Sequence, residues 1–373
     1  MSDTTLKSNV IIVAPLSSLS LRTRLYKLAL FLFETKCPQI THIAWERLPG
    51  ECIEHRLDFP VEKKILLKGG GYGSGRRYLY VLWMINVFFY GFKIKRNDVV
   101  WALGFESAFP LLLSSMIKGY TLCFDDADRF SMLIKNKILR FIVKTLEFLT
   151  SKLVYKHIIP SFERYNFTSK NFFLVENVPS DIVLKEAKTI YDNKEWKKFS
   201  LTINLNGWLS RSRGLAIILE ICDSLKNHDI GFIMAGKLDC DEAISLSKKS
   251  NVQYLGEVSN QEALASYYAS DFVFTYYDPI SEINRYAASN KWGDALKTGI
   301  GIIVNKEIIS AKKIIDTKVA IGLYYNDVNA LKSKIIYLSE HKNEVDILKK
   351  RALELGKDIP CFNMNIKKIF SLS

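Results

Sequence analysis

A lysine and an aspartate three residues apart mark the stretch of this chain that is best suited to bind an anion. Lys291 and Asp294 lie in residues 288–304, which predict a loop, a short helix, a glycine stop at Gly299 and a buried strand. Both side chains share one helix face near the N-terminus, where backbone N–H groups favour an anion. This arrangement suits a diphosphate, and a carboxylate one turn later suits a ribose diol. The alternative is an ordinary surface helix with an ion pair.

Three other loops of the second half follow predicted strands. In residues 206–214, Gly207 lets a ligand approach the backbone, and Arg211 or Arg213 could clamp a phosphate. Gly236 and Lys237 end the next strand, where a glycine again permits close approach. The third loop carries Gly256, Glu257 and Val258, whose backbone groups suit the reading of a base. Each loop alone is also compatible with a solvated turn.

Strands and helices alternate along the chain, which predicts an α/β protein with parallel sheets covered on both faces. The predicted strands are 9–14, 40–45, 98–102, 120–124, 153–160, 172–175, 200–206, 230–235, 252–255, 272–275 and 300–304. The alternation stops near Asn177 and restarts near residue 200. We therefore expect an N-terminal domain (1–178), a linker (179–198), a C-terminal donor domain (199–342) and a helical segment (343–373) that packs back on the first domain.

In their order and spacing, these motifs resemble the donor domain of GT-B glycosyltransferases, in the large retaining, nucleotide-sugar-dependent family called family 4. The matching segments are Arg213-Gly214, Ala235-Gly236, Val252–Ser259, Tyr268–Asp271, Ser289–Ile303 and, at the domain boundary, Asn177–Pro179. The resemblance implies two Rossmann-like domains that face a central cleft. It also implies that the donor is bound by Gly207, Arg211, Arg213, Gly236, Lys237, Glu257, Val258, Asn290, Lys291 and Asp294. It implies no cofactor besides the nucleotide sugar and no bound metal, because basic side chains and a helix N-terminus neutralise the leaving diphosphate.

The chain departs from the family pattern in its acidic residues. The family's two glutamates, eight positions apart, fall on Tyr286 and Asp294, so the first acid is missing. We expect Glu282, Asn284 or Arg285 to make its contact with the sugar hydroxyls. An inactive relative that only binds nucleotide sugars is the alternative.

The second departure is in the first half, where the family often carries a histidine after an acidic strand end. Here the sequence is Asp125-Asp126-Ala127-Asp128. These acids are expected to hold acceptor hydroxyls, and a D-x-D metal site is the alternative. In the loop after the first strand, Arg22 or Arg24 could reach a phosphate. None of the histidines pairs with a motif, so we name no general base.

Charge and hydropathy suggest a second partner for the first half. The chain carries a formal charge of +13, and residues 1–180 hold 25 Lys and Arg against 15 Asp and Glu. Such an excess favours nucleic acid or an anionic membrane. No nucleic-acid-binding module is recognisable in the sequence. Two stretches of the first half also favour the membrane. One is Tyr78–Phe92, too short to span a bilayer and flanked by Arg76, Arg77, Lys93, Lys95 and Arg96. The other is the basic amphipathic stretch Ser131–Phe148. Ordinary buried or surface helices are the alternative.

These observations predict the transfer of a sugar to a lipid-linked glycan during assembly of a bacterial surface polysaccharide. Scattered cysteines and the lack of a signal peptide suit a cytoplasmic protein, here expected at the inner face of the cell membrane. One alternative is an epimerase or a transferase with a small, soluble acceptor. Another is a non-catalytic partner that binds nucleotide sugars.

Overall fold

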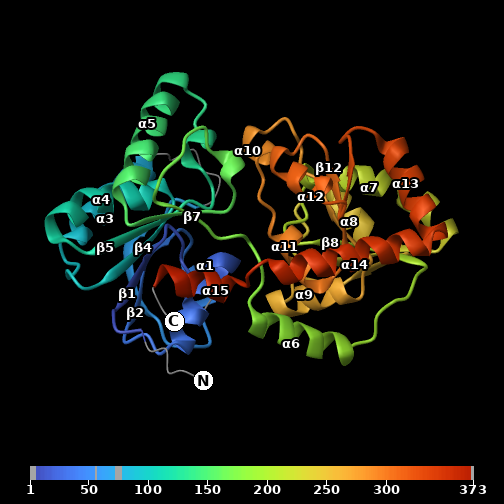
Figure 1. Ribbon diagram of the computed structural model, residues 1–373, viewed down its shortest axis with the longest axis horizontal. Coiled ribbons are helices and arrows are strands. Elements are labelled where there is room, and N and C mark those ends of the chain that lie inside the picture. Colours follow the sequence, from blue (N-terminus) through green and yellow to red (C-terminus); the bar gives the residue numbers. More distant parts are fainter. Residues whose placement is uncertain (1–5, 55–56, 72–77, 371–373) are drawn as a thin grey trace. The chain divides into compact units, whose positions relative to one another are not determined.

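The chain folds into two compact units, each built on one parallel sheet. The computed structural model describes residues 6–54, 57–71 and 78–370. The first unit comprises Met1–Glu176 and Asn363–Ser373, and the second comprises Asn177–Phe362. Both sheets are open and every strand pair in them is parallel (Figure 1). The predicted α/β class, with two Rossmann-like units, is therefore confirmed.

The first unit contains a seven-stranded sheet in the order β3-β2-β1-β4-β5-β6-β7. Its strands are β1 (Val10–Val13), β2 (Ile40–Glu46), β3 (Glu62–Lys68), β4 (Val99–Leu103), β5 (Thr121–Asp125), β6 (Lys156–Ile159) and β7 (Phe172–Leu174). The strand order reverses between β1 and β4. In open α/β sheets, the loops that leave the carboxyl ends of such strands form the usual ligand site.

Helices cover both faces of this sheet. They are α1 (Thr23–Glu34), α2 (Glu51–Glu54), α3 (Tyr78–Gly91), α4 (Phe105–Lys118), α5 (Lys137–Leu153) and the larger part of α15 (Phe362–Ile369). α3, α4 and α5 lie on one face, and α1 and α15 lie on the other (Figure 1). The core under α3 and α4 includes the fully buried Trp45 and Trp83. On the opposite face, Trp101 stacks on Phe370, with ring centroids 6.3 Å apart.

The second unit contains a six-stranded sheet in the order β10-β9-β8-β11-β12-β13. Its strands are β8 (Leu201–Asn206), β9 (Ile230–Ala235), β10 (Val252–Tyr254), β11 (Phe272–Thr275), β12 (Gly301–Asn305) and β13 (Ala320–Leu323). Its helices are α6 (Asp181–Asp192), α7 (Leu215–Leu225), α8 (Asp241–Ser247), α9 (Asn260–Tyr268), α10 (Glu282–Arg285), α11 (Asn290–Thr298), α12 (Lys312–Asp316), α13 (Val328–Glu340) and α14 (Lys342–Asp358).

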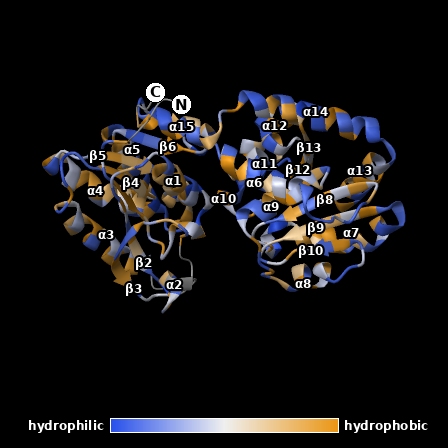
Figure 2. Cartoon of the chain, turned by 90° about the horizontal axis from the view of Figure 1, so that it is seen from below, coloured by the Kyte–Doolittle hydropathy of each residue, from blue (hydrophilic) through white to orange (hydrophobic). Residues whose placement is uncertain are grey.

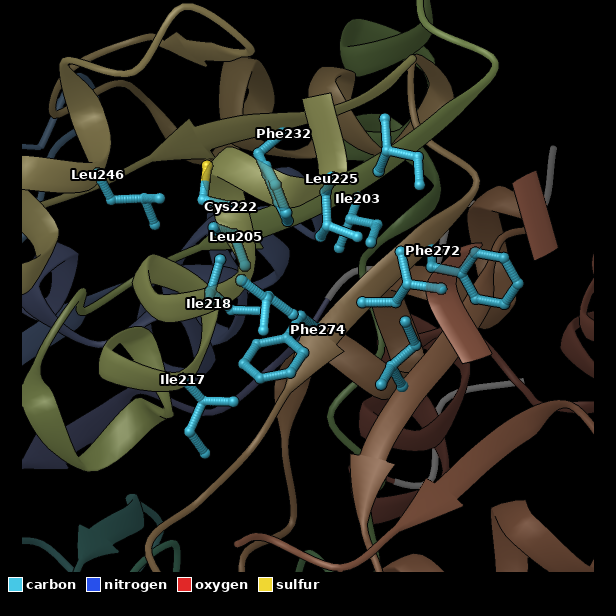
Figure 3. Close-up of a cluster of buried hydrophobic side chains, with 14 of the residues drawn as sticks. Ile203, Leu205, Ile217, Ile218, Cys222, Leu225, Phe232, Leu246, Phe272 and Phe274 are labelled. Carbon is cyan, nitrogen blue, oxygen red and sulfur yellow. The ribbon is translucent and has the colours of Figure 1, made fainter. Parts of the chain in front are cut away.

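A continuous apolar core holds this sheet and α7 together. Phe232 of β9 and Phe272 and Phe274 of β11 belong to one buried cluster with Ile218 of α7 (Figure 3). The strand order reverses between β8 and β11, so the loops after these two strands occupy the position where ligands bind in this class of fold.

Several predicted segments have a different structure. The sequence pattern predicts no strand at β3 or β13, which are the edge strands on one side of each sheet. The range 179–198, expected as a linker, contains α6, which packs against α9 of the second unit. Of the C-terminal segment 343–373, α14 packs on α11 within the second unit, and only the residues from Asn363 belong to the first unit.

Candidate functional site

Two glycines bring the loops after β8 and β9 into backbone contact. Gly236 has φ +122°, and the carbonyl oxygen of Gly207 fills the space that a Cβ on Gly236 would need. Gly207 itself has φ +93° and donates its N–H to Ala235 O at 2.8 Å. The next loop joins through Gly236 N–H, which donates to Gly256 O at 2.8 Å. Only glycine tolerates this conformation and this approach, so the close packing of the loops depends on both glycines.

The two arginines of the β8 loop face different surroundings. Arg211 is 82% exposed and donates to Glu242 Oε1, with its Nη2 2.8 Å away. The Arg213 guanidinium lies 4.2 Å from the centroid of the Tyr277 ring, and its buried Nη1 has no hydrogen-bond partner. A buried guanidinium nitrogen without an acceptor is costly, because it has given up water without a replacement. Arg213 is therefore the better candidate for an anionic ligand.

Lys291 lies beside Arg213 at the start of α11. The Ser289 side chain caps this helix by accepting from Lys291 N at 3.3 Å, and Tyr277 Oη in turn bonds Ser289 Oγ at 2.7 Å. The Lys291 side chain extends over Gly207, where an added Cβ would stand 3.6 Å from Lys291 Cε. Burial and, to a lesser degree, the Arg213 guanidinium lower the pKa of the Lys291 ammonium to about 7, and Asp294 partly opposes them. Two neighbouring cations therefore meet at a glycine loop.

Asp294 lies one turn further along α11 and is partly exposed. It interacts electrostatically with Lys291, and it contributes with burial to the raised pKa of Tyr267. The Tyr267 hydroxyl is buried and has no hydrogen-bond partner. Among the other predicted donor residues, Asn290, Lys237 and Glu257 are exposed and Val258 is half-buried. Their roles in donor binding stay predictions.

The candidates for the missing acid lie on the short helix α10. Glu282 is half-buried and Arg285 is exposed, and the Asn284 side chain is held by a hydrogen bond to Asp278 O at 3.0 Å. This helix belongs to the second unit, whereas the three aspartates Asp125, Asp126 and Asp128 belong to the first.

Asp125 is fully engaged by the protein itself. Arg24 Nε donates to both of its carboxylate oxygens, at 2.8 and 3.0 Å, and Trp101 Nε1 donates to Oδ2 at 2.9 Å. Arg24 also donates to Val175 O. This buried network ties α1 to β4, β5 and the segment after β7. It gives both residues a structural role, which differs from the predicted contacts of Arg24 with phosphate and of Asp125 with an acceptor.

Asp126 and Asp128 are less constrained. Tyr165 Oη donates to Asp126 Oδ2 at 2.6 Å and His157 Nε2 lies 3.5 Å from it, while the buried Oδ1 has no partner. Burial alone would raise the pKa of Asp126, but its interactions with His157 and Tyr165 outweigh burial and lower it. Asp128 is about half exposed and pairs with Arg22 at 3.5 Å.

Glu106 is a candidate that sequence reasoning missed. It lies in the first turn of α4, directly after β4, at the point where the strand order of the first sheet reverses. Its carboxylate folds back over Gly104, whose φ is +76°. Burial and, to a lesser degree, the nearby Asp126 charge raise the pKa of Glu106 to about 7. A carboxyl that titrates near neutrality at a strand end is typical of a functional site. The available signal was the Gly104-Phe105-Glu106 sequence after a buried strand.

Within the described residues, no group of three or more His, Cys, Asp or Glu side chains is arranged to hold a metal ion. The same part of the chain has no helix that combines the length and the apolarity needed to cross a bilayer.

Comparison with known proteins identifies the fold. No protein-family model matches the chain, and no curated protein matches it by sequence. A sucrose-phosphate synthase from Thermosynechococcus elongatus superposes with a TM-score of 0.70 and 11% identity over 98% of both chains. Anabaena HepE in complex with UDP gives 0.67 and 11%, over 98% of this chain and 99% of HepE. A protein described as a UDP-N-acetylglucosamine 2-epimerase, from Listeria monocytogenes, gives 0.62 and 13%, over 98% and 97%. The chain therefore has the GT-B fold.

Proposed function

We propose that the protein is a glycosyltransferase that moves a sugar from a nucleoside-diphosphate donor to a glycan acceptor. The observation that carries this proposal is the pairing of Arg213 and Lys291 beside the Gly207 loop. Two partly buried cations repel each other, and one keeps a donor nitrogen without an acceptor. A diphosphate would supply both the missing negative charge and the missing acceptor atoms.

The donor would lie across the strand ends of the second sheet. Its diphosphate would contact Arg213, Lys291 and the N-terminus of α11, where the positive end of the helix dipole favours an anion. Asp294 would accept from the ribose hydroxyls, and the backbone around Glu257 and Val258 would contact the base. UDP bound to a structural neighbour supports a nucleotide in a protein of this fold. Glu282 or Arg285 would contact the sugar.

In the reaction, the bond from the anomeric carbon to the diphosphate oxygen breaks and a bond to an acceptor hydroxyl oxygen forms. The acceptor proton leaves, and the electron pair of the broken bond stays on the nucleoside diphosphate. Arg213 and Lys291 would stabilise the charge that develops there, which is the largest contribution in many enzymes. Retention of configuration is proposed from the resemblance to family 4.

The proposed acceptor is a lipid-linked glycan of a surface polysaccharide, presented at an anionic membrane. Asp126, Asp128 and Glu106 would hold acceptor hydroxyls at the carboxyl edge of the first sheet, because carboxylate oxygens accept from hydroxyl groups. The excess of positive charge in residues 1–180 supports the membrane as partner.

A second candidate function is epimerisation of a nucleotide sugar. The neighbour described as a UDP-N-acetylglucosamine 2-epimerase favours it, and so does Tyr286 at the place of the missing glutamate. Such an enzyme would convert the sugar of the donor without an acceptor and without membrane affinity.

A panel of nucleotide sugars screened by thermal unfolding tests the proposal, because a ligand that binds the folded state raises the unfolding temperature. We expect stabilisation by at least one nucleotide sugar, its loss in Arg213→Ala and its retention in Arg211→Ala, the matched control whose side chain pairs with Glu242. No stabilisation by any member, or equal stabilisation of both variants, would refute this donor site. Product analysis with and without a glycan acceptor then separates transfer from epimerisation.

A further inference from the structure

Helix α5 buries mostly polar residues and exposes apolar ones, the opposite of an ordinary surface helix. The side buried in the first unit holds Glu147, Thr150 and Ser151, and Val143 is its one buried apolar residue. The outward side is a stripe of large apolar residues at helical spacing, namely Ile138, Phe141, Ile142, Leu149 and Leu153, between 45% and 75% exposed. An ordinary surface helix turns such a stripe toward the core. An exposed apolar stripe of this kind is typical of an interaction site.

The neighbouring helices of the same layer extend the apolar surface. The outward residues of α4 are Leu113, Met116 and Ile117, with Ile117 72% exposed. On α3 they are Tyr78, Val81, Leu82, Ile85 and Phe89. The inner side of α3, with Trp83, Val87 and Gly91, belongs to the core. α3 packs on α4 and α4 packs on α5, so the three outer sides adjoin (Figure 2). We call this surface the α3–α5 face.

The charges on the α3–α5 face have one sign. The three helices contain two acids, and both are turned inward: Glu147 is buried against Arg129 and Glu106 is folded over Gly104. Exposed lysines flank the apolar stripes, with Lys118 after Ile117 and Lys135 and Lys137 before Ile138. Lys93, Lys95 and Arg96 follow α3 and are also exposed. Arg76 and Arg77, which were predicted to contribute, lie outside the described residues. An apolar face with a basic margin complements anionic headgroups over acyl chains.

We propose that the α3–α5 face docks onto an anionic bilayer, with α5 lying in the interface plane. This inference deepens the proposed function, on which it rests, because it names the surface that meets the membrane carrying the acceptor. The apolar side chains of α5 enter the headgroup and acyl boundary, and the lysines contact lipid phosphates. A helix in this position binds peripherally and does not span the membrane.

Co-sedimentation with phosphatidylcholine vesicles, with and without phosphatidylglycerol, tests the proposal on the full chain. We expect binding to the mixed vesicles alone, weakened by salt. The double substitution Ile138→Ser, Phe141→Ser should lower partitioning at least about tenfold, since buried apolar area drives interfacial binding. Its matched control is Ile244→Ser, Ile347→Ser, at apolar positions of the second unit that are 41% and 48% exposed. Replacing Lys118, Lys135 and Lys137 by Glu should abolish binding, whereas the same change at Lys312, Lys342 and Lys350 should not.

Three outcomes would overturn the inference: equal binding to both vesicle types, no binding to either, or a stable oligomer that the Ile138→Ser, Phe141→Ser variant dissolves. The last would make the face a protein interface. Thermal stabilisation by UDP, measured on the same variants, separates this inference from the proposed function. If UDP stabilises the protein but the protein does not bind vesicles, membrane docking is refuted and the donor site is kept. If the protein binds vesicles but no nucleotide, the proposed donor site is refuted and membrane docking is kept.

Discussion

The carbonyl oxygen of Gly207 occupies the place where a side chain on Gly236 would begin. This contact joins the loops after β8 and β9 through their backbones, and Lys291 extends over the same loop. The candidate donor site is thus built around two closely packed glycine backbones, with the Lys291 side chain beside them.

We predict that Gly236→Ala distorts this loop pair. The new methyl group would collide with Gly207, and φ +122° is unfavourable for alanine, so the free energy of unfolding should fall by about 2 kcal/mol or more. Gly256→Ala is the matched control, because its φ is also positive, at +87°, but nothing lies within 4 Å of the added Cβ. Urea unfolding measures both variants. Equal losses of unfolding free energy in the two variants would show that the positive φ alone, and not the contact with Gly207, accounts for the effect.

Lys291→Ala should lower sugar transfer at least about 100-fold, which corresponds to about 2.7 kcal/mol of lost transition-state stabilisation. The reason is the loss of one of the two cations that face the leaving diphosphate. Steady-state rates with saturating acceptor measure the effect, and the exposed Lys312→Ala is the control. A near-normal rate in Lys291→Ala would place the diphosphate elsewhere.

Binding of the diphosphate should take up a proton at Lys291. The pKa of this lysine is lowered to about 7 in the free protein, and an anionic ligand raises it. Affinity should therefore decrease as the pH rises above 7, and calorimetry at pH 8 in buffers of different ionisation enthalpy should detect the uptake. In Lys291→Arg the uptake should vanish, because arginine stays protonated. Uptake that persists in this variant would assign the proton to another group.

Glu106 should decrease the stability of the protein above neutral pH. Its pKa is raised to about 7 in the folded state, so its stabilising contribution is complete below the unfolded-state pKa and is lost as the pH rises through 7. Glu106→Gln should therefore unfold with a higher free energy at pH 8, by up to about 3 kcal/mol, and with little change at pH 4. Transfer should fall in the same variant, and the exposed Glu354→Gln should change neither. A pH-independent difference would argue against a raised pKa.

Transfer should need no divalent ion, because Arg213, Lys291 and the N-terminus of α11 already offer positive charge to the diphosphate. EDTA should leave the initial rate unchanged. If EDTA abolished transfer and Mg²⁺ or Mn²⁺ restored it, Asp126 and Asp128 would have to be considered as ligands.

The sequence predicted the central strands because each is a short apolar run between turn signals. It missed β3, whose residues Glu62–Lys68 include three lysines, because an edge strand is paired on one side only and tolerates charge. It missed α6 because the polar segment after Pro179 resembled a linker. That helix is amphipathic, with Val183 and Ala187 buried, and it packs on α9 of the second unit.

The candidate site could be predicted in part. The spacing of Lys291 and Asp294 located α11, but the choice between Arg211 and Arg213 depended on a short turn that directs one to Glu242 and the other to Tyr277. The hydrogen bond between Arg24 and Asp125 joins residues 101 positions apart, so no local sequence pattern could predict it. Glu106 also went unnoticed, because its raised pKa arises from burial and from Asp126, which lies on another strand end.

The first unit is assembled from two stretches that lie far apart in the sequence, since the residues from Asn363 onward join it and Phe370 stacks on Trp101. During synthesis, its sheet can form once Glu176 has left the ribosome, but the segment from Asn363 that reaches Trp101 is made only after the second unit. At ordinary elongation rates that delay is roughly 10 to 40 s. Over this interval one side of the nascent unit exposes Trp101 to water while its other side presents the α3–α5 face. Ribosome-bound chains in this interval should therefore present apolar surface to chaperones.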